Sequence, residues 1–231
     1  MQNSILITGA SGLLGKALVR EFSEKDFFVF AQYHGNLPGE FSRQPAEVID
    51  MGDIHALHET SGFGGAAGKS QWLQADFSSM SGINDFLVEN SLRFKRCTAL
   101  VNNYGPITYK STADLTADDF YFDFHHNVIT AFEITNFFVR HTDVRVVVNV
   151  GFEGVGTVKA YKKILSYAAA KNALQLITQS FSAQYKNIRF HMAAPPTLEG
   201  AAVKAKRGHT VTPQSVAEEI YKIVMNNSMV A

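Results

Sequence analysis

A tyrosine and a lysine, Tyr167 and Lys171, stand four positions apart in a stretch with helical character. Residues i and i+4 share one face of a helix, so the ammonium of Lys171 can lie beside the phenol of Tyr167. A positive charge there would lower the pKa of the phenol and make it a usable proton donor or acceptor near neutral pH. The same spacing also arises by chance on solvated helix faces, so it predicts acid–base chemistry only together with a second motif.

A glycine-rich turn near the N-terminus supplies that second motif. Residues 4–8 form a short apolar run, and residues 13–22 have helical periodicity. Gly9, Gly12 and Gly15 lie in the turn and at the start of the helix. Glycines there allow a tight turn, close approach of backbone N–H groups to a pyrophosphate, and close packing of helix on strand. The two motifs together predict dinucleotide binding and hydride transfer.

Composition indicates one α/β domain over residues 1–231. The chain is 46% apolar, and its 21 lysines and arginines equal its 21 aspartates and glutamates. A neutral balance argues against nucleic acid and anionic membranes as partners. Cys97 is the only cysteine, which excludes an internal disulfide. A strand beginning at Ser4 leaves no room for a signal peptide, and no apolar run reaches the ~18 residues of a membrane span. We therefore expect a soluble, cytoplasmic protein.

Alternating strand and helix patterns predict a Rossmann-type, doubly wound parallel sheet with helices on both faces. The predicted strands cover residues 4–8, 27–33, 72–75, 99–102, 145–150 and 188–193. The predicted helices cover residues 13–22, 83–93, 124–141, 165–185 and 213–226, the last with Thr212 as N-cap and Pro213 at its first position. Residues 35–71 lack periodicity and are expected to form an irregular, mobile insertion; the alternative is an element that touches cofactor or substrate.

Further residues resemble the short-chain dehydrogenase/reductase family over nearly the whole chain. Asn102, Asn103, Tyr104 and Gly105 look like the family's Asn-Asn-Ala-Gly, with Tyr104 in place of the alanine. Asn127 is similar to the family asparagine that bends its helix and holds a proton-relay water. The resemblance implies an oxidoreductase that uses NAD or NADP on a small-molecule substrate.

The resemblance also implies two sets of site residues and no metal ion. The catalytic residues would be Asn127, Tyr167 and Lys171, with Glu153 as a further candidate. The cofactor-binding residues would be Gly9, Ser11, Gly12, Leu14, Gly15, Tyr33, His34, Asp76, Phe77, Asn103, Tyr104, Gly105, Tyr167, Lys171, Pro195 and Thr197. Two of these residues have structural alternatives: Asp76 could cap the next helix, and Asn127 could serve only to satisfy helix backbone groups.

The family serine that hydrogen-bonds the substrate carbonyl has no counterpart in this chain. Counted back from Tyr167 its place falls at Gly154, and counted from the end of the preceding strand it falls at Gly151 or Phe152. Glu153 is the nearest polar side chain. It could orient a substrate, donate a proton if burial raises its pKa, or be an ordinary exposed loop acid.

Residues at the end of the second predicted strand bear on substrate and cofactor. Pteridine reductases, a branch of the same family, carry a Tyr-His pair there and an aspartate in place of the serine, and Tyr33 and His34 resemble that pair. A pterin, quinone or ketone is therefore the expected substrate. Folds that prefer NAD place an acid at this strand end, whereas this chain has Gln32, Tyr33 and His34. NADP is thus favoured over NAD, with His34 or Arg43 near the 2′-phosphate; alternatively His34 is an exposed loop residue.

The implied reaction is hydride transfer to a C=O or C=N carbon while Tyr167 supplies a proton. Lys171 would bind the nicotinamide ribose, and Asn127 would link the site to solvent through water. Loss of one donor to the developing oxyanion costs about 2.7–4 kcal/mol unless another group compensates. The competing hypothesis is therefore a weak or inactive NADP-binding sensor or scaffold with the same fold.

The glycine spacing by itself also suggests a nucleotide-sugar epimerase or dehydratase, but that would need a larger C-terminal domain than the residues after Pro196 provide. The family resemblance further implies a homo-oligomer, a dimer or tetramer. It leaves open whether the chain has the family's seventh strand.

Overall fold

A six-stranded parallel sheet forms the centre of the molecule. This computed structural model describes residues 3–25, 27–35, 69–157, 160–201 and 210–226. The spatial order of the strands is β3-β2-β1-β4-β5-β6. The strands are β1 (Asn3–Ile7), β2 (Phe27–Tyr33), β3 (Ser70–Gln74), β4 (Cys97–Asn102), β5 (Val146–Val150) and β6 (Arg189–Ala193). The order reverses between β1 and β4, and ligands of open α/β sheets bind at such a switch point.

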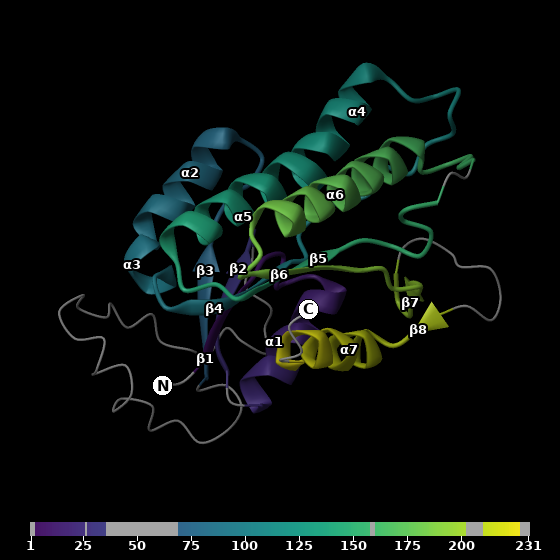
Figure 1. Cartoon of the computed structure of the whole chain (residues 1–231). Coiled ribbons are helices and arrows are strands. Elements are labelled where there is room, and N and C mark those ends of the chain that lie inside the picture. Colours follow the sequence, from purple (N-terminus) through teal and green to yellow (C-terminus); the bar gives the residue numbers. More distant parts are fainter. Residues whose placement is uncertain (1–2, 26, 36–68, 158–159, 202–209, 227–231) are drawn as a thin grey trace.

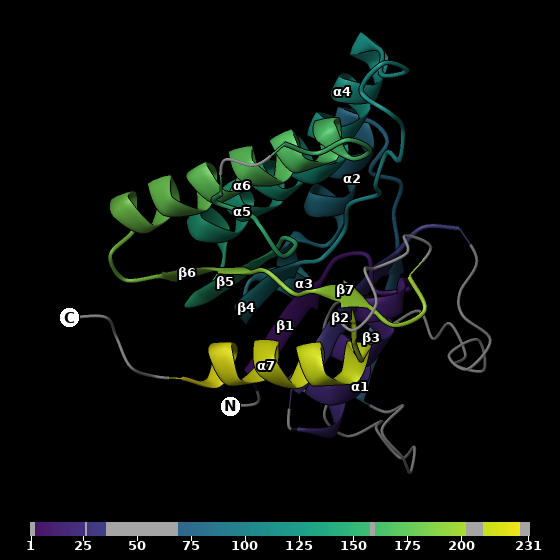
Figure 2. The ribbon, with the colours of Figure 1, turned by 90° about the vertical axis from the view of Figure 1, so that its right-hand side faces the viewer.

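Helices cover both faces of this sheet, as Figures 1 and 2 show from two directions. One face carries α1 (Leu13–Glu24) and α7 (Pro213–Met225). The other face carries α2 (Met80–Glu89), α3 (Ser91–Phe94), α4 (Ala117–Phe124), α5 (Thr130–His141) and α6 (Leu165–Gln184). Two short strands, β7 (Thr197–Leu198) and β8 (Thr210–Val211), pair apart from the main sheet. The predicted Rossmann-type fold is confirmed.

The alternation of strand side chains divides the core into two layers. In β1, Ile5 and Ile7 join the cluster under α1 and α7, which includes Phe22, whereas Leu6 joins the cluster that includes Phe138 on the opposite face. All five side chains are fully buried. Each burial stabilises the fold by about 1.5–3 kcal/mol. The helices are therefore fixed against the sheet whose carboxyl edge forms the site.

The element boundaries differ from the prediction where local capping outweighs periodicity. Helix α2 begins at Met80 because the Ser79 Oγ accepts the N–H of Gly82 at 3.1 Å. Helix α4 was not predicted, although Thr116 and Asp119 form a capping box at its start. Thr212 caps α7 as predicted.

Part of the predicted irregular segment 35–71 is structured, since β3 begins at Ser70. Residues 36–68, and with them Arg43, lie outside the described residues, as do residues 227–231, where a further strand would follow α7.

Candidate active site

The glycine turn predicted to hold a pyrophosphate lies between β1 and α1. Gly9 has a φ of 63°, and a Cβ built on it would come 2.8 Å from the Cα of Tyr104. A Cβ on Gly15 would come 2.2 Å from the backbone oxygen of Gly9. Only glycine fits at these two positions without movement of the backbone. Gly12 is the N-cap of α1 and makes no side-chain cap, so the first N–H groups of the helix remain available to an anion.

The end of β4 is fastened to this turn by four hydrogen bonds. The Asn103 side chain donates to the backbone oxygens of Thr8 at 3.1 Å and Gly9 at 3.0 Å. The Thr8 Oγ1 accepts the N–H groups of Asn103 and Tyr104, each at 3.1 Å. Asn103 therefore shapes the turn directly, in addition to its predicted role at the cofactor.

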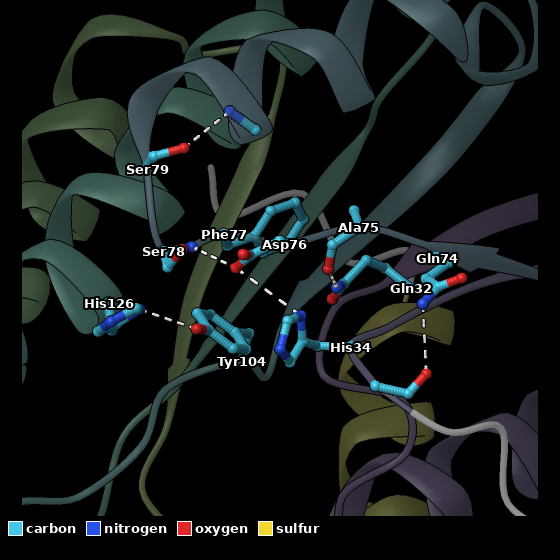
Figure 3. Close-up of polar contacts among 12 residues, drawn as sticks. Gln32, His34, Gln74, Ala75, Asp76, Phe77, Ser78, Ser79, Tyr104 and His126 are labelled. Carbon is cyan, nitrogen blue, oxygen red and sulfur yellow. Dashed lines mark hydrogen bonds and ion pairs between the residues drawn. The ribbon is translucent and has the colours of Figure 1, made fainter.

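Gln32 links three loops at this edge, although the sequence did not single it out as a site residue. Its side chain is fully buried. Its Oε1 accepts the N–H of Gly9 at 2.9 Å. Its Nε2 donates to the oxygen of Ala75 at 3.0 Å (Figure 3). The glycine turn is thereby tied to the ends of β2 and β3. A lone amide inside the apolar run of β2 was the available signal, since a buried amide requires partners.

His34 and Asp76 approach each other across the ends of β2 and β3 (Figure 3). The Nδ1 of His34 lies 3.7 Å from the Oδ1 of Asp76, and both side chains are more than half exposed. The N–H of Ser78 donates to Asp76 at 2.8 Å, and this bond, with the His34 charge adding to it, lowers the pKa of that carboxyl. The alternative that Asp76 caps α2 is wrong, because Ser79 holds that position. Tyr33, at the end of β2, is half-buried, and its ring centre lies 6.0 Å from that of Trp72.

Tyr104, the departure from the family's alanine, is held in an aromatic cluster. Its hydroxyl is 2.8 Å from the Nδ1 of His126, and its ring meets the edge of Phe77 with the ring centres 5.4 Å apart (Figure 3). Burial raises the pKa of Tyr104 to about 12. The side chain of Phe77 is itself in the core. If Phe77 contacts a cofactor as predicted, it can therefore do so only through its backbone atoms.

The remaining predicted cofactor residues flank the same edge. Ser11 lies half-buried in the glycine turn, whereas the side chain of Leu14 points into the core. The backbone oxygen of Pro195 accepts the N–H of Glu153 at 2.8 Å, which joins the loops after β5 and β6. Thr197 begins β7.

Asn127 lies in a π-helical turn, His125–Ile129, that joins α4 to α5. Single π turns within helices are frequent at functional sites. Its Nδ2 donates to the backbone oxygens of Pro106 and Asp123, both at 3.0 Å, so it does satisfy helix backbone. Its buried Oδ1, however, has no partner among the described residues. A Cβ on Gly105 would come 2.2 Å from that Oδ1 and 3.3 Å from the Nζ of Lys171.

The predicted pair on α6 is brought together. The Nζ of Lys171 lies 5.7 Å from the centre of the Tyr167 ring and donates to the oxygen of Val150 at 2.8 Å. Burial lowers the pKa of Lys171 to about 8, against an opposing effect of Asp123. The expectation of a lowered tyrosine pKa is not met: burial raises the pKa of Tyr167, and Asp123 raises it further. Desolvation of the phenol outweighs the lysine because the ammonium is directed at Val150.

An aromatic ring occupies the region in which the family serine was sought. The Phe152 ring centre lies 5.5 Å from that of Tyr167 and 5.6 Å from that of Tyr161. At Gly154 the φ is 104° and a Cβ would come 2.6 Å from the Tyr161 hydroxyl, so a serine would be strained there. The Glu153 side chain is exposed and makes no hydrogen bond to the described residues. Its proposed catalytic role gains no support from these contacts.

Sequence reasoning missed one buried acid in this site, Asp123. It is 0% exposed and accepts the hydroxyl hydrogen of Ser166 at 2.5 Å. An acid within the aromatic stretch from Phe120 to Phe124 was the available signal.

The sheet, the glycine turn at its switch point and the Tyr167–Lys171 pair define a dinucleotide-binding oxidoreductase fold. The family model for short chain dehydrogenases matches residues 3–211, and the chain belongs to that family. A search of curated proteins finds no match.

Solved structures share the fold at low sequence identity. A Bacillus thuringiensis protein provisionally described as a 3-oxoacyl-reductase has a TM-score of 0.78 at 20% identity, covering 100% of this chain and 94% of its own. ElxO, solved with NADP bound, has a TM-score of 0.76 at 16% identity over the same shares. An alcohol dehydrogenase from the archaeon Thermococcus sibiricus, in complex with 5-hydroxy-NADP, has a TM-score of 0.74 at 15% identity, covering 97% and 91%.

Two searches of the described residues complete the description of the site. No helix in this part of the chain is long and apolar enough to cross a membrane. No group of three or more histidine, cysteine or acidic side chains there could hold a metal ion.

Proposed function

We propose that this protein is an NADP-dependent reductase of C=O or C=N groups in which Tyr167 donates the proton. The arrangement of three side chains carries the proposal. Lys171 is buried beside Tyr167, and Asn127 directs an unpartnered Oδ1 into the space that the missing Cβ of Gly105 leaves open. A buried acceptor without a donor is costly. A water or ligand hydroxyl at this point would satisfy it, and would give Tyr167 a route to recover its proton.

The residues present fit a nicotinamide dinucleotide. The glycine turn would hold the pyrophosphate, because Cβ atoms on Gly9 and Gly15 would fill it. Asp76 would contact the adenine, and Lys171 would bind the nicotinamide ribose. When bound, NADPH supplies the hydride. The family, the NADP complex of one structural neighbour and the 5-hydroxy-NADP complex of another support a cofactor of this class.

The preference for NADP is inferred from the residues at the carboxyl end of β2. Gln32 stands where an acid would accept the ribose hydroxyls of NAD, and its amide is already used within the protein. His34 is exposed at the same strand end and would contact a 2′-phosphate. Its present partner Asp76 would compete for it. Contacts between exposed side chains of this length are weak, so a phosphate can displace it.

The phenol of Tyr167 carries its proton at neutral pH and can donate it to the substrate heteroatom, although burial and Asp123 raise its pKa and so make it a weaker acid than a free tyrosine. Phe152 and Tyr161 would present aromatic surface next to it. A flat, conjugated substrate such as a quinone or pterin fits this surface better than an aliphatic ketone.

One observation favours the competing hypothesis of a weak enzyme or an NADP-binding sensor. If Phe152 stands at the place of the family serine, its ring supplies no hydrogen-bond donor there, and loss of such a donor costs ~10²–10³ in rate.

Titration of the purified protein with NADPH and with NADH, followed by nicotinamide fluorescence, tests the proposal. We expect NADPH to bind more tightly, and His34→Asp to weaken NADPH binding by at least about tenfold, or ~1.4 kcal/mol. His141 is an exposed histidine on α5, and His141→Asp is the matched control. It should leave the affinity for NADPH unchanged. Equal affinity for NADH would overturn the NADP preference, and failure to bind either nucleotide would overturn the function.

A further inference from the structure

Asp123 is a buried acid to which the mechanism proposed above assigns no role. Its side chain is 0% exposed. One carboxylate oxygen accepts the Ser166 hydroxyl at 2.5 Å, and the other accepts the N–H of Thr108 at 3.3 Å. A carboxylate of this kind is expensive to bury unless charge compensates it. Its presence inside the site therefore calls for a function.

The position of Asp123 connects three parts of the candidate active site. It stands in α4, four residues before Asn127, and its backbone oxygen accepts the Nδ2 of Asn127 at 3.0 Å. Its side chain holds Ser166, the residue that precedes Tyr167 in the first turn of α6. The turn that carries the tyrosine is thereby tied to the bend that carries the asparagine.

The charge of Asp123 acts on the titratable groups around it. Its negative charge raises the pKa of Tyr167 and of Lys171, which lie on α6. It also raises the pKa of His126, which lies in the π turn. Among these groups Lys171 is the fully buried cation that can balance the carboxylate. Each of the two charges therefore offsets part of the cost of burying the other.

We propose that Asp123 is a positioning residue, whose buried carboxylate fixes the first turn of α6 against the bend at Asn127 and offsets the charge of the buried Lys171 beside Tyr167. This inference rests on the proposed function, since it concerns the same catalytic group. A tyrosine that carries its proton can give it to a substrate heteroatom, as the proposed reduction requires.

Lys171 can be titrated without any substrate. In protein labelled with carbon-13 at the lysine ε carbon, the Lys171 resonance is assigned as the one lost in Lys171→Met. The midpoint of the titration of its chemical shift with pH should lie near pH 8. In Asp123→Asn, which keeps an oxygen for Thr108 and a polar partner for Ser166, the midpoint should fall by about one pH unit or more. An unchanged midpoint in folded Asp123→Asn protein would overturn the proposal.

Asp119→Asn is the matched control. It removes a carboxylate from the same helix, one turn earlier, and with it the ion pair to Lys110. It should lower stability but leave the Lys171 midpoint in place. If both variants move that midpoint equally, the effect is damage to α4 and the proposal fails.

A measurement on the wild-type protein does not depend on the folding of any Asp123 variant. The carboxyl carbon resonance of Asp123 should shift at the pH at which Lys171 titrates, because the two groups are coupled. Absence of that step would contradict the proposal. Both measurements remain decisive if the protein turns over no substrate, so failure of this inference and failure of the proposed function are distinguishable.

Discussion

The ammonium of Lys171 lies 5.7 Å from the ring centre of Tyr167, yet its hydrogen bond goes to the backbone oxygen of Val150 at 2.8 Å. The two side chains are neighbours without being directly bonded. Burial therefore dominates both, and it disfavours the charged form of each.

Lys171 should make stability depend on pH. Its pKa falls from 10.5 to about 8 on folding. Between these values the unfolded chain holds a proton that the folded protein has released, so stability rises with pH in this window. We expect the unfolding free energy of the wild type, less that of Lys171→Met, to increase by about 3 kcal/mol across it. Urea denaturation at several pH values measures both proteins; a flat or falling difference would show that the ammonium is not desolvated.

Gly15 should tolerate no side chain. A Cβ there meets the Gly9 oxygen at 2.2 Å and the Ala10 Cα at 2.6 Å, both backbone atoms. Gly15→Ala should cost about 2 kcal/mol or more through overpacking. At Gly12 the nearest atom is 3.2 Å away, so Gly12→Ala should cost only about 1 kcal/mol through the poorer helix cap. Urea unfolding compares the two variants, and equal losses would count against a backbone collision at Gly15.

Phe152→Ser should restore a hydrogen-bond donor beside Tyr167. If Phe152 stands at the place of the family serine, the variant should raise kcat for carbonyl reduction by about tenfold or more, up to ~10². Gly154→Ser is the comparison, because a side chain there is strained at a φ of 104°. It should lower stability without raising the rate. A gain in Gly154→Ser but none in Phe152→Ser would place the serine position at Gly154.

The sequence predicted the fold well because its signals were local and repeated. The glycines at positions 9, 12 and 15, the apolar run in β1 and the Thr212 cap each indicate the local structure from a few neighbouring residues. The capping box at Thr116 was missed because α4 has too little apolar periodicity to mark a helix by itself.

The electrostatics of the site could not be predicted in this way. The direction of the Tyr167 pKa depends on how deeply the phenol is buried and on where the lysine donates its hydrogen bond. Gln32 and Asp123 act through partners more than 40 residues away, Ala75 and Ser166. Spacing along the chain carries no information about such contacts. The cytoplasmic location and the homo-oligomer stay predictions.

The central claim is that Tyr167 donates the proton in an NADPH-dependent reduction. Its most direct test is the oxidation of NADPH, followed by absorbance, with a panel of quinones, pterins and ketones. The wild type should turn over at least one of them. Tyr167→Phe should lose about 10²- to 10⁴-fold in kcat while still binding NADPH, and the exposed Tyr121→Phe should match the wild type. Turnover by Tyr167→Phe at the wild-type rate would contradict the account.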